Sequence, residues 1–216
     1  MNSKQRWEDH YSRQAKKDRY PARSVYKLKE IQHKYRLINK GDKVLDLGCA
    51  PGSWLLYAAS LTGASGRVVG IDLKPVSVSL PSYVQVHIGD VLSMDAEMFK
   101  KLGEDFNMVM SDMAPATTGR KDVDAARSFT LCCRALRIAS FCLCTGGSFI
   151  CKIFQGEDFM GFIHQVKSVF HRHKIIKPQS SRKASREVYV IGLNKKQEGV
   201  CQVTANGLPF DIKKAP

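Results

Sequence analysis

The stretch from Lys43 to Trp54, KVLDLGCAPGSW, is the feature that most constrains the fold of this chain. Its first part is a short apolar run with one acid, Asp46, and is typical of a β-strand. The small residues 48–52 then predict a tight turn, and the apolar pattern after them predicts a helix. At the carboxyl end of a parallel strand, such a glycine turn lets a ligand approach the backbone closely. The spacing is not GxGxxG and no P-loop lysine follows, which argues against a dinucleotide or a nucleoside triphosphate.

Two further strands are expected to end beside an acid. The segment RVVGIDL, residues 67–73, contains Asp72, which lies roughly 20 residues beyond the glycine turn, where an acid reaches a ribose hydroxyl in a βαβ nucleotide site. The strand expected at 83–88 runs into Asp90. Because DLGCAPG stands in place of GxGxxG, this layout indicates an S-adenosylmethionine site. The ribose would face Asp72, the adenine would lie near Asp90, and the methionine part would lie at the glycine turn.

Strands and helices alternate along most of the remaining chain. We expect strands at 44–47, 67–73, 83–88, 106–110, 148–154, 173–178 and 187–193, and helices at 24–38, 54–59, 94–102, 122–143 and 159–170. The pair Gly146-Gly147 is expected to end the long fourth helix. Since the last two strands follow each other without a helix between them, the pattern predicts an α/β, doubly wound sheet with a closing hairpin at one edge. We expect a basic N-terminal extension at 1–20, one domain at 21–193 and a C-terminal tail at 194–216.

Two residues stand out against this pattern. Asp112 follows the strand at 106–110 and would face the same crevice as Asp46 and Asp72. Lys152 interrupts an otherwise apolar strand, SFICKIF, and a central parallel strand is buried on both faces. A lysine there is unfavourable unless it is paired or used in function, although a lysine at the strand's end could reach solvent. For Lys27, inside the first helix, the sequence alone favours a solvent-facing position.

The charge of the chain is concentrated in two segments. The formal net charge is +14, with +8 in residues 1–43 and +7 in residues 172–196. Two basic segments that flank a nearly neutral middle predict a polyanionic partner, with a merely solvated surface as the alternative. No apolar run approaches the roughly 20 residues of a membrane span, and no signal or transit segment is visible, so we expect a cytoplasmic protein without a membrane segment. The seven cysteines show no CxxC spacing, which predicts neither a disulfide framework nor a metal site.

Four motifs, DLGCAPGSW, MSDMAP, CKIFQGE and SSRKASREVYV, together resemble the FtsJ/RrmJ family of RNA 2′-O-methyltransferases from about Arg19 to Leu193. The resemblance implies a Rossmann-like S-adenosylmethionine-dependent methyltransferase fold, with a seven-stranded, mostly parallel sheet whose last strand is antiparallel. It also implies an enzyme that methylates the ribose 2′-hydroxyl of a uridine in 23S ribosomal RNA, in the assembled large ribosomal subunit. We expect it to act as a monomer.

The resemblance assigns roles to individual residues. The family's catalytic Lys-Asp-Lys-Glu tetrad falls on Lys27, Asp112, Lys152 and Glu187. Its cofactor contacts fall on Gly52, Trp54, Asp72, Asp90 and Asp112. The basic segments would bind RNA through Lys16, Lys17, Arg19, Arg23, Arg182, Lys183 and Arg186. The chain departs from the family at Ser53, where a second glycine is usual, and at residues 116–118, where Asn and Ser are more usual.

In this chemistry Lys152, uncharged when it acts, would accept or orient the proton of the ribose hydroxyl, and no metal is required. Ribose methylation of transfer RNA or of an mRNA cap uses the same tetrad and stays open as an alternative. A non-catalytic RNA-binding factor for ribosome assembly is another, although the complete tetrad argues against it. A small-molecule methyltransferase is opposed by the two basic segments.

Overall fold

The structure is a computed structural model that describes residues 3–197. The helices are α1 (Ser3–Lys17), α2 (Val25–Tyr35), α3 (Ser53–Thr62), α4 (Ala96–Leu102), α5 (Lys121–Cys142) and α6 (Phe159–Val169). The strands are β1 (Lys43–Leu47), β2 (Arg67–Asp72), β3 (Val84–Ile88), β4 (Phe106–Ser111), β5 (Leu143–Phe154), β6 (Phe170–Ile176) and β7 (Glu187–Lys195). None of these helices is both long enough and apolar enough to cross a membrane.

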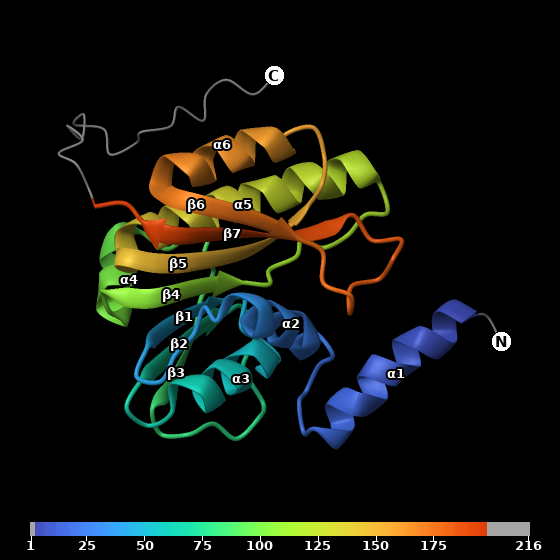
Figure 1. The fold of residues 1–216 in the computed structure, drawn as a ribbon, viewed down its shortest axis with the longest axis horizontal. Coiled ribbons are helices and arrows are strands. Elements are labelled where there is room, and N and C mark those ends of the chain that lie inside the picture. The colour runs from blue at the N-terminus through green and yellow to red at the C-terminus, as the bar shows by residue number, and fades with distance from the viewer. Residues whose placement is uncertain (1–2, 198–216) are drawn as a thin grey trace.

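The strands form one seven-stranded sheet in the order β3-β2-β1-β4-β5-β7-β6 (Figure 1). Strands β1 to β5 pair in parallel, whereas β7 pairs antiparallel with both β5 and β6. The predicted fold class is therefore confirmed, including the antiparallel last strand and the hairpin at one edge. Within that hairpin the last strand lies inward and β6 forms the edge.

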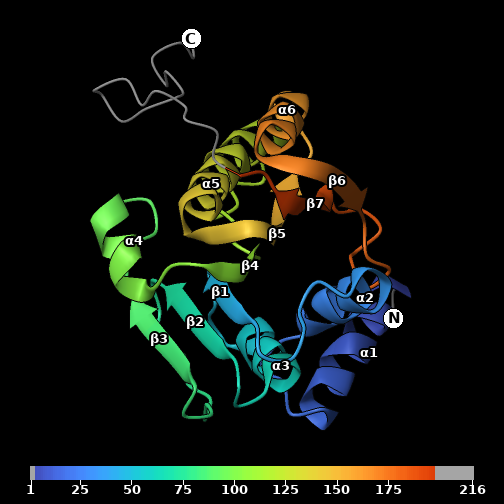
Figure 2. The same ribbon diagram turned by 60° about the vertical axis from the view of Figure 1, so that its left-hand side comes forward.

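Helices cover both faces of the sheet, so the central strands are buried on both sides (Figures 1 and 2). One apolar core lies between the sheet and α4, α5 and α6, and includes Phe149 and Phe162. The other lies between the sheet and α2 and α3, and includes Leu28 and Tyr189. This three-layer arrangement explains why β1 and β4 are almost continuously apolar.

The strand register brings the predicted functional residues to one end of the sheet. Leu47 pairs with Ile71 on β2 and with Ser111 on β4, and Ser111 pairs with Cys151 on β5. The residues that follow these positions, Asp72, Asp112 and Lys152, therefore lie at adjacent carboxyl ends of the strands. Helix α1 and the β6–β7 connection lie at the same end of the molecule (Figure 1).

The prediction that Gly146-Gly147 ends the long helix was wrong. Helix α5 ends at Cys142, and β5 begins at Leu143, which is buried and pairs with Phe106. The register between β4 and β5 shifts in this region, and Gly146 has a φ of +83°, which glycine adopts readily. The glycine pair thus allows an irregular stretch inside the strand instead of a helix stop.

The two ends of the chain also differ from expectation. Residues 3–17, which lie within the expected basic N-terminal extension at 1–20, form helix α1, whose Ala15 is buried. Strand β7 continues to Lys195, two residues beyond its expected end, because Lys195 pairs with Phe170 on β6. Most of the expected C-terminal tail, residues 198–216, lies outside the described residues.

Candidate active site

The glycine turn between β1 and α3 is held tightly by its neighbours. Gly52 has a φ of +109°, and a Cβ there would lie 2.8 Å from Val76 Cγ1 and 2.9 Å from Val78 Cγ2, so only glycine fits. Asp72 Oδ2 accepts a hydrogen bond from the backbone N–H of Ala50 at 2.9 Å. The two predicted cofactor contacts Gly52 and Asp72 thus belong to one preformed turn at the carboxyl ends of β1 and β2.

The third predicted cofactor contact, Asp90, follows β3 in a braced loop. Its Oδ1 accepts a hydrogen bond from the backbone N–H of Leu92 at 2.9 Å. Arg134 on α5 donates through Nε to the Val91 carbonyl at 2.6 Å, and through Nη2 to the Met94 carbonyl. Sequence reasoning missed Arg134, because nothing near it in the chain links it to this loop.

Another acid at this end of the sheet, Asp46, is fully buried. Neither of its carboxylate oxygens has a hydrogen-bond partner within residues 3–197. Burial raises its pKa well above the ordinary value, and the negative charges of Asp112 and Asp72 raise it further. The negative charges of Asp112 and Asp72 act on this floor of the crevice, which suits a cationic ligand. The sulfonium and ammonium groups of S-adenosylmethionine have that charge, so the residues present fit the expected cofactor.

We expect Asp46→Asn to raise the melting temperature of the cofactor-free protein at about pH 7.5, by roughly 2–4 °C for each 1 kcal/mol gained. The pKa of Asp46 is raised in the folded state, so its ionisation destabilises the fold. This loss of stability begins above the unfolded-state pKa of about 3.9 and is complete above the folded-state pKa. Scanning calorimetry of both proteins from about pH 5 to pH 8 checks the prediction, because the gain should grow with pH. An equal or lower melting temperature for the variant at every pH would contradict it.

The lysine predicted to act in catalysis, Lys152, lies beside Asp112 at the ends of β5 and β4. Its Nζ lies 2.9 Å from Asp112 Oδ1 and also donates to the Asp112 carbonyl. The Lys152 side chain is 8% exposed and the Asp112 side chain 17%, so solvent screens this pair little. The structure thus brings together two of the four residues predicted to be catalytic.

The other two predicted catalytic residues, Lys27 and Glu187, form a second ion pair. Lys27 Nζ lies 2.6 Å from Glu187 Oε1, and the two side chains are 13% and 12% exposed. The interpretation of Lys27 as a solvent-facing lysine was therefore wrong. Helix α2 packs Leu28 and Ile31 into the core, and this places Lys27 over the start of β7 instead of in solvent.

A tyrosine that sequence reasoning missed, Tyr189, joins the two ion pairs. Its hydroxyl donates to Asp112 Oδ1 at 2.6 Å, and Lys27 Nζ lies 5.8 Å from its ring centroid. Burial raises the pKa of Tyr189 well above its ordinary value, and the negative charges of Asp112 and Glu187 add to this. Burial would also raise the pKa of Asp112, but the charges of Lys152 and Lys27, together with the hydrogen bonds from Tyr189 and Lys152, outweigh it and leave that pKa below its ordinary value. Near neutral pH, Asp112 is therefore ionised and Tyr189 remains a hydrogen-bond donor.

Trp54, predicted to contact the cofactor, is almost fully buried, with 3% of its surface exposed. Its indole N–H donates to the Ser24 carbonyl at 2.9 Å, and its ring stacks on Tyr189 with the ring centroids 5.8 Å apart. In this position Trp54 packs against Tyr189 and helps to fix the orientation of the Tyr189 ring. A direct contact between Trp54 and the cofactor stays a prediction.

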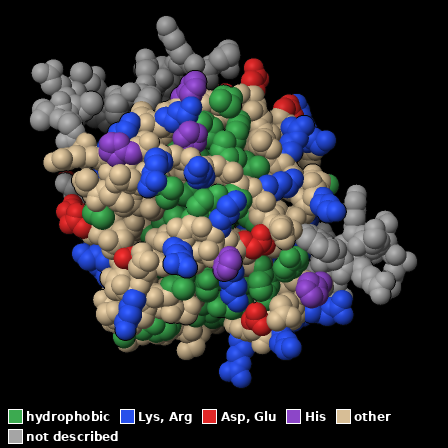
Figure 3. Space-filling model, in the orientation of Figure 1, with side chains coloured by type: hydrophobic (Ala, Val, Ile, Leu, Met, Phe, Trp, Pro, Cys, Tyr) green, Lys and Arg blue, Asp and Glu red, His purple; other side chains and the backbone are tan. Residues whose placement is uncertain are grey.

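Most of the residues predicted to bind RNA are exposed. The exposed ones are Lys16, Lys17, Arg19, Arg182, Lys183 and Arg186. Arg23 differs: its Nη2 donates to the Ser180 carbonyl at 2.9 Å, and its guanidinium lies 5.6 Å from the Tyr11 ring centroid. Lys and Arg side chains also recur across the face of the molecule shown in Figure 3. The structure thus presents six of these seven residues to solvent and holds Arg23 against the body.

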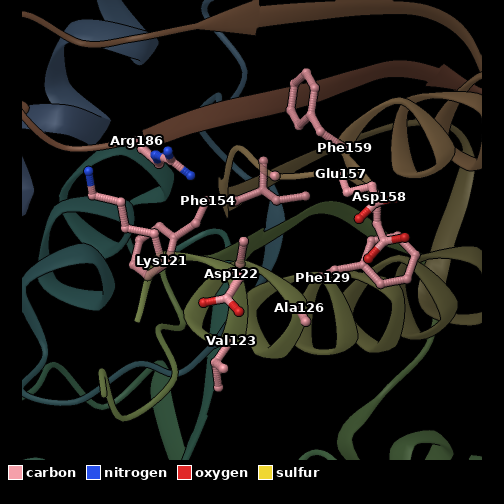
Figure 4. A pocket seen from close by; sticks show the side chains of 13 residues that line it. Lys121, Asp122, Val123, Ala126, Phe129, Phe154, Glu157, Asp158, Phe159 and Arg186 are labelled. Carbon is pink, nitrogen blue, oxygen red and sulfur yellow. The ribbon is translucent and has the colours of Figure 1, made fainter. Parts of the chain in front are cut away.

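A cavity of about 640 Å³ adjoins the site on the α5 and α6 side of the sheet. Lys121 and Arg186 lie on one side of it and Glu157 and Asp158 on the other (Figure 4). Phe154, two residues after Lys152, forms part of its wall. With Asp122, three acids line the cavity against two cations, so the cavity itself is not a strong binding site for phosphate.

Known structures share this arrangement of sheet and helices. A candidate ribosomal RNA methyltransferase from Plasmodium falciparum superposes with a TM-score of 0.72 at 25% identity, covering 83% of this chain and all of that one. Aeropyrum pernix fibrillarin, solved with natively bound S-adenosyl-L-methionine, has a TM-score of 0.54 at 18% identity, over 73% of this chain and 68% of its own. The fold is therefore that of the S-adenosylmethionine-dependent methyltransferases.

Sequence comparison identifies the family of methyltransferases to which the chain belongs. Residues 20–195 match the family described as FtsJ-like methyltransferase. The ribosomal RNA large subunit methyltransferase E of Desulforapulum autotrophicum is 60% identical over 193 residues, which are 89% of this chain and 95% of that protein. The protein of the same name from Desulfatibacillum aliphaticivorans is 53% identical over 190 residues, 88% of this chain and 92% of its own. The chain belongs to the FtsJ-like methyltransferase family, which confirms the resemblance found in its motifs.

Proposed function

We propose that this protein transfers a methyl group from S-adenosylmethionine to the ribose 2′-hydroxyl of a uridine in 23S ribosomal RNA, within the large ribosomal subunit. The observation that carries the proposal is the pairing of Lys152 with Asp112 and of Lys27 with Glu187, linked by Tyr189, at the carboxyl end of the sheet. The large-subunit methyltransferases at 60% and 53% identity support the choice of substrate.

The acids at the strand ends are proposed to hold the cofactor. Asp72 would bind the ribose and Asp90 the adenine, while Gly52 and the buried Asp46 lie under the methionine part. The exposed side chains of Leu73 and Leu92, next to these two acids, offer apolar contact for a flat ring. S-adenosylmethionine supplies an electrophilic methyl group on a positively charged sulfur when it is bound.

Lys152 is proposed to act in its uncharged form, in which the lone pair of its amine can accept or orient the proton of the ribose hydroxyl. A ribose hydroxyl is a weak nucleophile, so the protein must align the oxygen and assist removal of its proton. Asp112 fixes Lys152 through its carboxylate and its carbonyl, and Tyr189 in turn fixes Asp112. Lys27 and Glu187 would hold the other side of the ribose. In this arrangement, the amine proposed to move the proton is held by the partly buried carboxylate of Asp112.

The six exposed cations of the two basic segments are proposed to bind RNA phosphates on either side of the site. Helix α1 and the β6–β7 connection, which carry most of them, lie at the end of the molecule where β4 ends (Figure 1), and Asp112 of the tetrad directly follows β4. Since large ribosomal subunits are cytoplasmic, the proposed activity belongs to the cytoplasm. Action as a monomer stays a prediction.

The experiment that tests the proposal measures transfer of labelled methyl groups to purified large ribosomal subunits lacking this modification and, separately, to bulk transfer RNA. We expect label in the 23S RNA, mapped to one uridine by primer extension that stops at 2′-O-methyl groups. Label in transfer RNA alone would overturn the proposed substrate. Absence of label in either RNA, with cofactor binding intact by calorimetry, would favour a non-catalytic assembly factor.

A further inference from the structure

The connection between β6 and β7, residues 177–186, is held against helix α2 by hydrogen bonds that involve the backbone of the connection. Glu30 Oε2 accepts a hydrogen bond from the backbone N–H of Gln179 at 2.6 Å, and Glu30 Oε1 accepts one from the N–H of Ser180 at 2.8 Å. Arg23 donates to the carbonyl of the same Ser180 at 2.9 Å. Hydrogen bonds to a charged carboxylate are about twice as strong as neutral ones. One acid thus fixes two successive amides of a segment 149 residues away.

The residue that follows Ser180, Ser181, contacts the candidate active site. This residue is buried, with 3% of its surface exposed, and its hydroxyl donates to Glu187 Oε1 at 2.7 Å. The same oxygen lies 2.6 Å from Lys27 Nζ. Helix α2 therefore holds Glu187 in two ways: directly through Lys27, and through Glu30, one helical turn further on, which secures the loop that carries Ser181.

We infer that Ser181 is a positioning residue for Glu187, and that Glu30 sets the position of Ser181. Two donors on Oε1 hold the Glu187 carboxylate in one rotamer and leave Oε2 to face the substrate. Lys27 alone, at the end of a flexible chain, would permit several orientations. The inference rests on the proposed role of Glu187 in the reaction.

The hydrogen bonds from Gln179 and Ser180 to Glu30 also fix the position at which the basic part of the connection begins. Arg182 and Lys183 follow Ser181 directly, and Lys177 Nζ donates to the carbonyls of Lys183 at 3.1 Å and Ser185 at 2.7 Å. Because the connection is held both by Glu30 and by Lys177, it presents its cations in a fixed arrangement before RNA binds. This lowers the entropy lost on binding. Glu30 thereby connects the RNA-binding segment to the Glu187 carboxylate.

Substitutions at Ser181 and at Glu30 should have different effects on the kinetics of methylation of large ribosomal subunits. Ser181→Ala removes one hydrogen bond to a charged group, so we expect kcat to fall about 10- to 100-fold with little change in KM. Ser181→Thr keeps the hydroxyl and should retain most of the activity. Glu30→Gln leaves one acceptor oxygen for two N–H donors, so it should raise KM for the subunit as well as lower kcat.

Two control variants make the result decisive. Ser168→Ala, on the exposed surface of α6, removes a serine hydroxyl far from the site and should behave as wild type. Glu187→Ala, run in parallel, separates the two claims: if it retains wild-type activity, the proposed site is wrong. If Glu187→Ala is inactive while Ser181→Ala matches wild type, the positioning role alone is overturned. Equal losses in Ser181→Ala and Ser181→Thr would also overturn it, because the hydroxyl would then not be what matters.

Discussion

Replacing Lys152 by alanine is expected to lower the rate of methyl transfer by about 10³-fold, within the range that a positioned acid or base contributes. Lys152 is the buried amine that Asp112 holds at 2.9 Å, and no other described lysine contacts that carboxylate so directly. Single-turnover transfer of labelled methyl to large ribosomal subunits, at saturating cofactor, measures this step. Cofactor affinity, measured by calorimetry, should change much less than the rate.

Two companion variants separate proton transfer from charge and from stability. Lys152→Arg keeps the positive charge, but a guanidinium does not lose its proton in proteins, so this variant should be nearly as slow as alanine. Lys195 is a second buried lysine, bonded to the Leu143 carbonyl at 2.8 Å at the opposite end of the sheet. Lys195→Met should lower the melting temperature yet leave the rate of the folded protein unchanged. If Lys152→Arg were as active as wild type, Lys152 would act by charge alone.

Much of this site could be predicted because local patterns specify it. A strand, a glycine turn and a helix place Gly52 and Asp72 in one crevice, since parallel strands end at the same edge of a sheet. Lys152 stood out because a charged residue inside an apolar strand requires a partner. The structure supplies that partner in Asp112, which follows the adjacent strand.

Other parts of the site depend on contacts that no local pattern reveals. Glu30 and Ser180 meet across 150 residues, and nothing in either segment indicates the other. Arg134 was missed for the same reason. For Tyr189 a signal did exist: it lies two residues after Glu187, so strand alternation places both side chains on one face of β7. Lys27 was misjudged because helical spacing alone does not say which strand end lies beneath a helix.

The affinity for RNA is expected to fall about 10³-fold between roughly 50 and 200 mM salt, as for a protein that makes about six phosphate contacts. The cations proposed to make such contacts are Lys16, Lys17, Arg19, Arg182, Lys183 and Arg186, all exposed. Arg23 is left out of this count because it holds the Ser180 carbonyl and lies over Tyr11. Filter binding or anisotropy with an RNA fragment of the large subunit, repeated over several salt concentrations, measures the slope.

Single variants test which cations carry this slope. Each phosphate contact contributes about 0.7–0.9 to the slope of log affinity against log salt, because each contact releases condensed counterions. Arg182→Ala should therefore reduce the slope by about that amount. Lys101→Ala removes the same charge from an exposed position on helix α4, away from the tetrad, and should leave the slope unchanged. Equal reductions in both variants would mean that RNA responds to the overall charge of +14 and not to the two basic segments. A slope reduced only by Arg182→Ala would place the RNA backbone beside the loop that Glu30 and Ser181 connect to the tetrad.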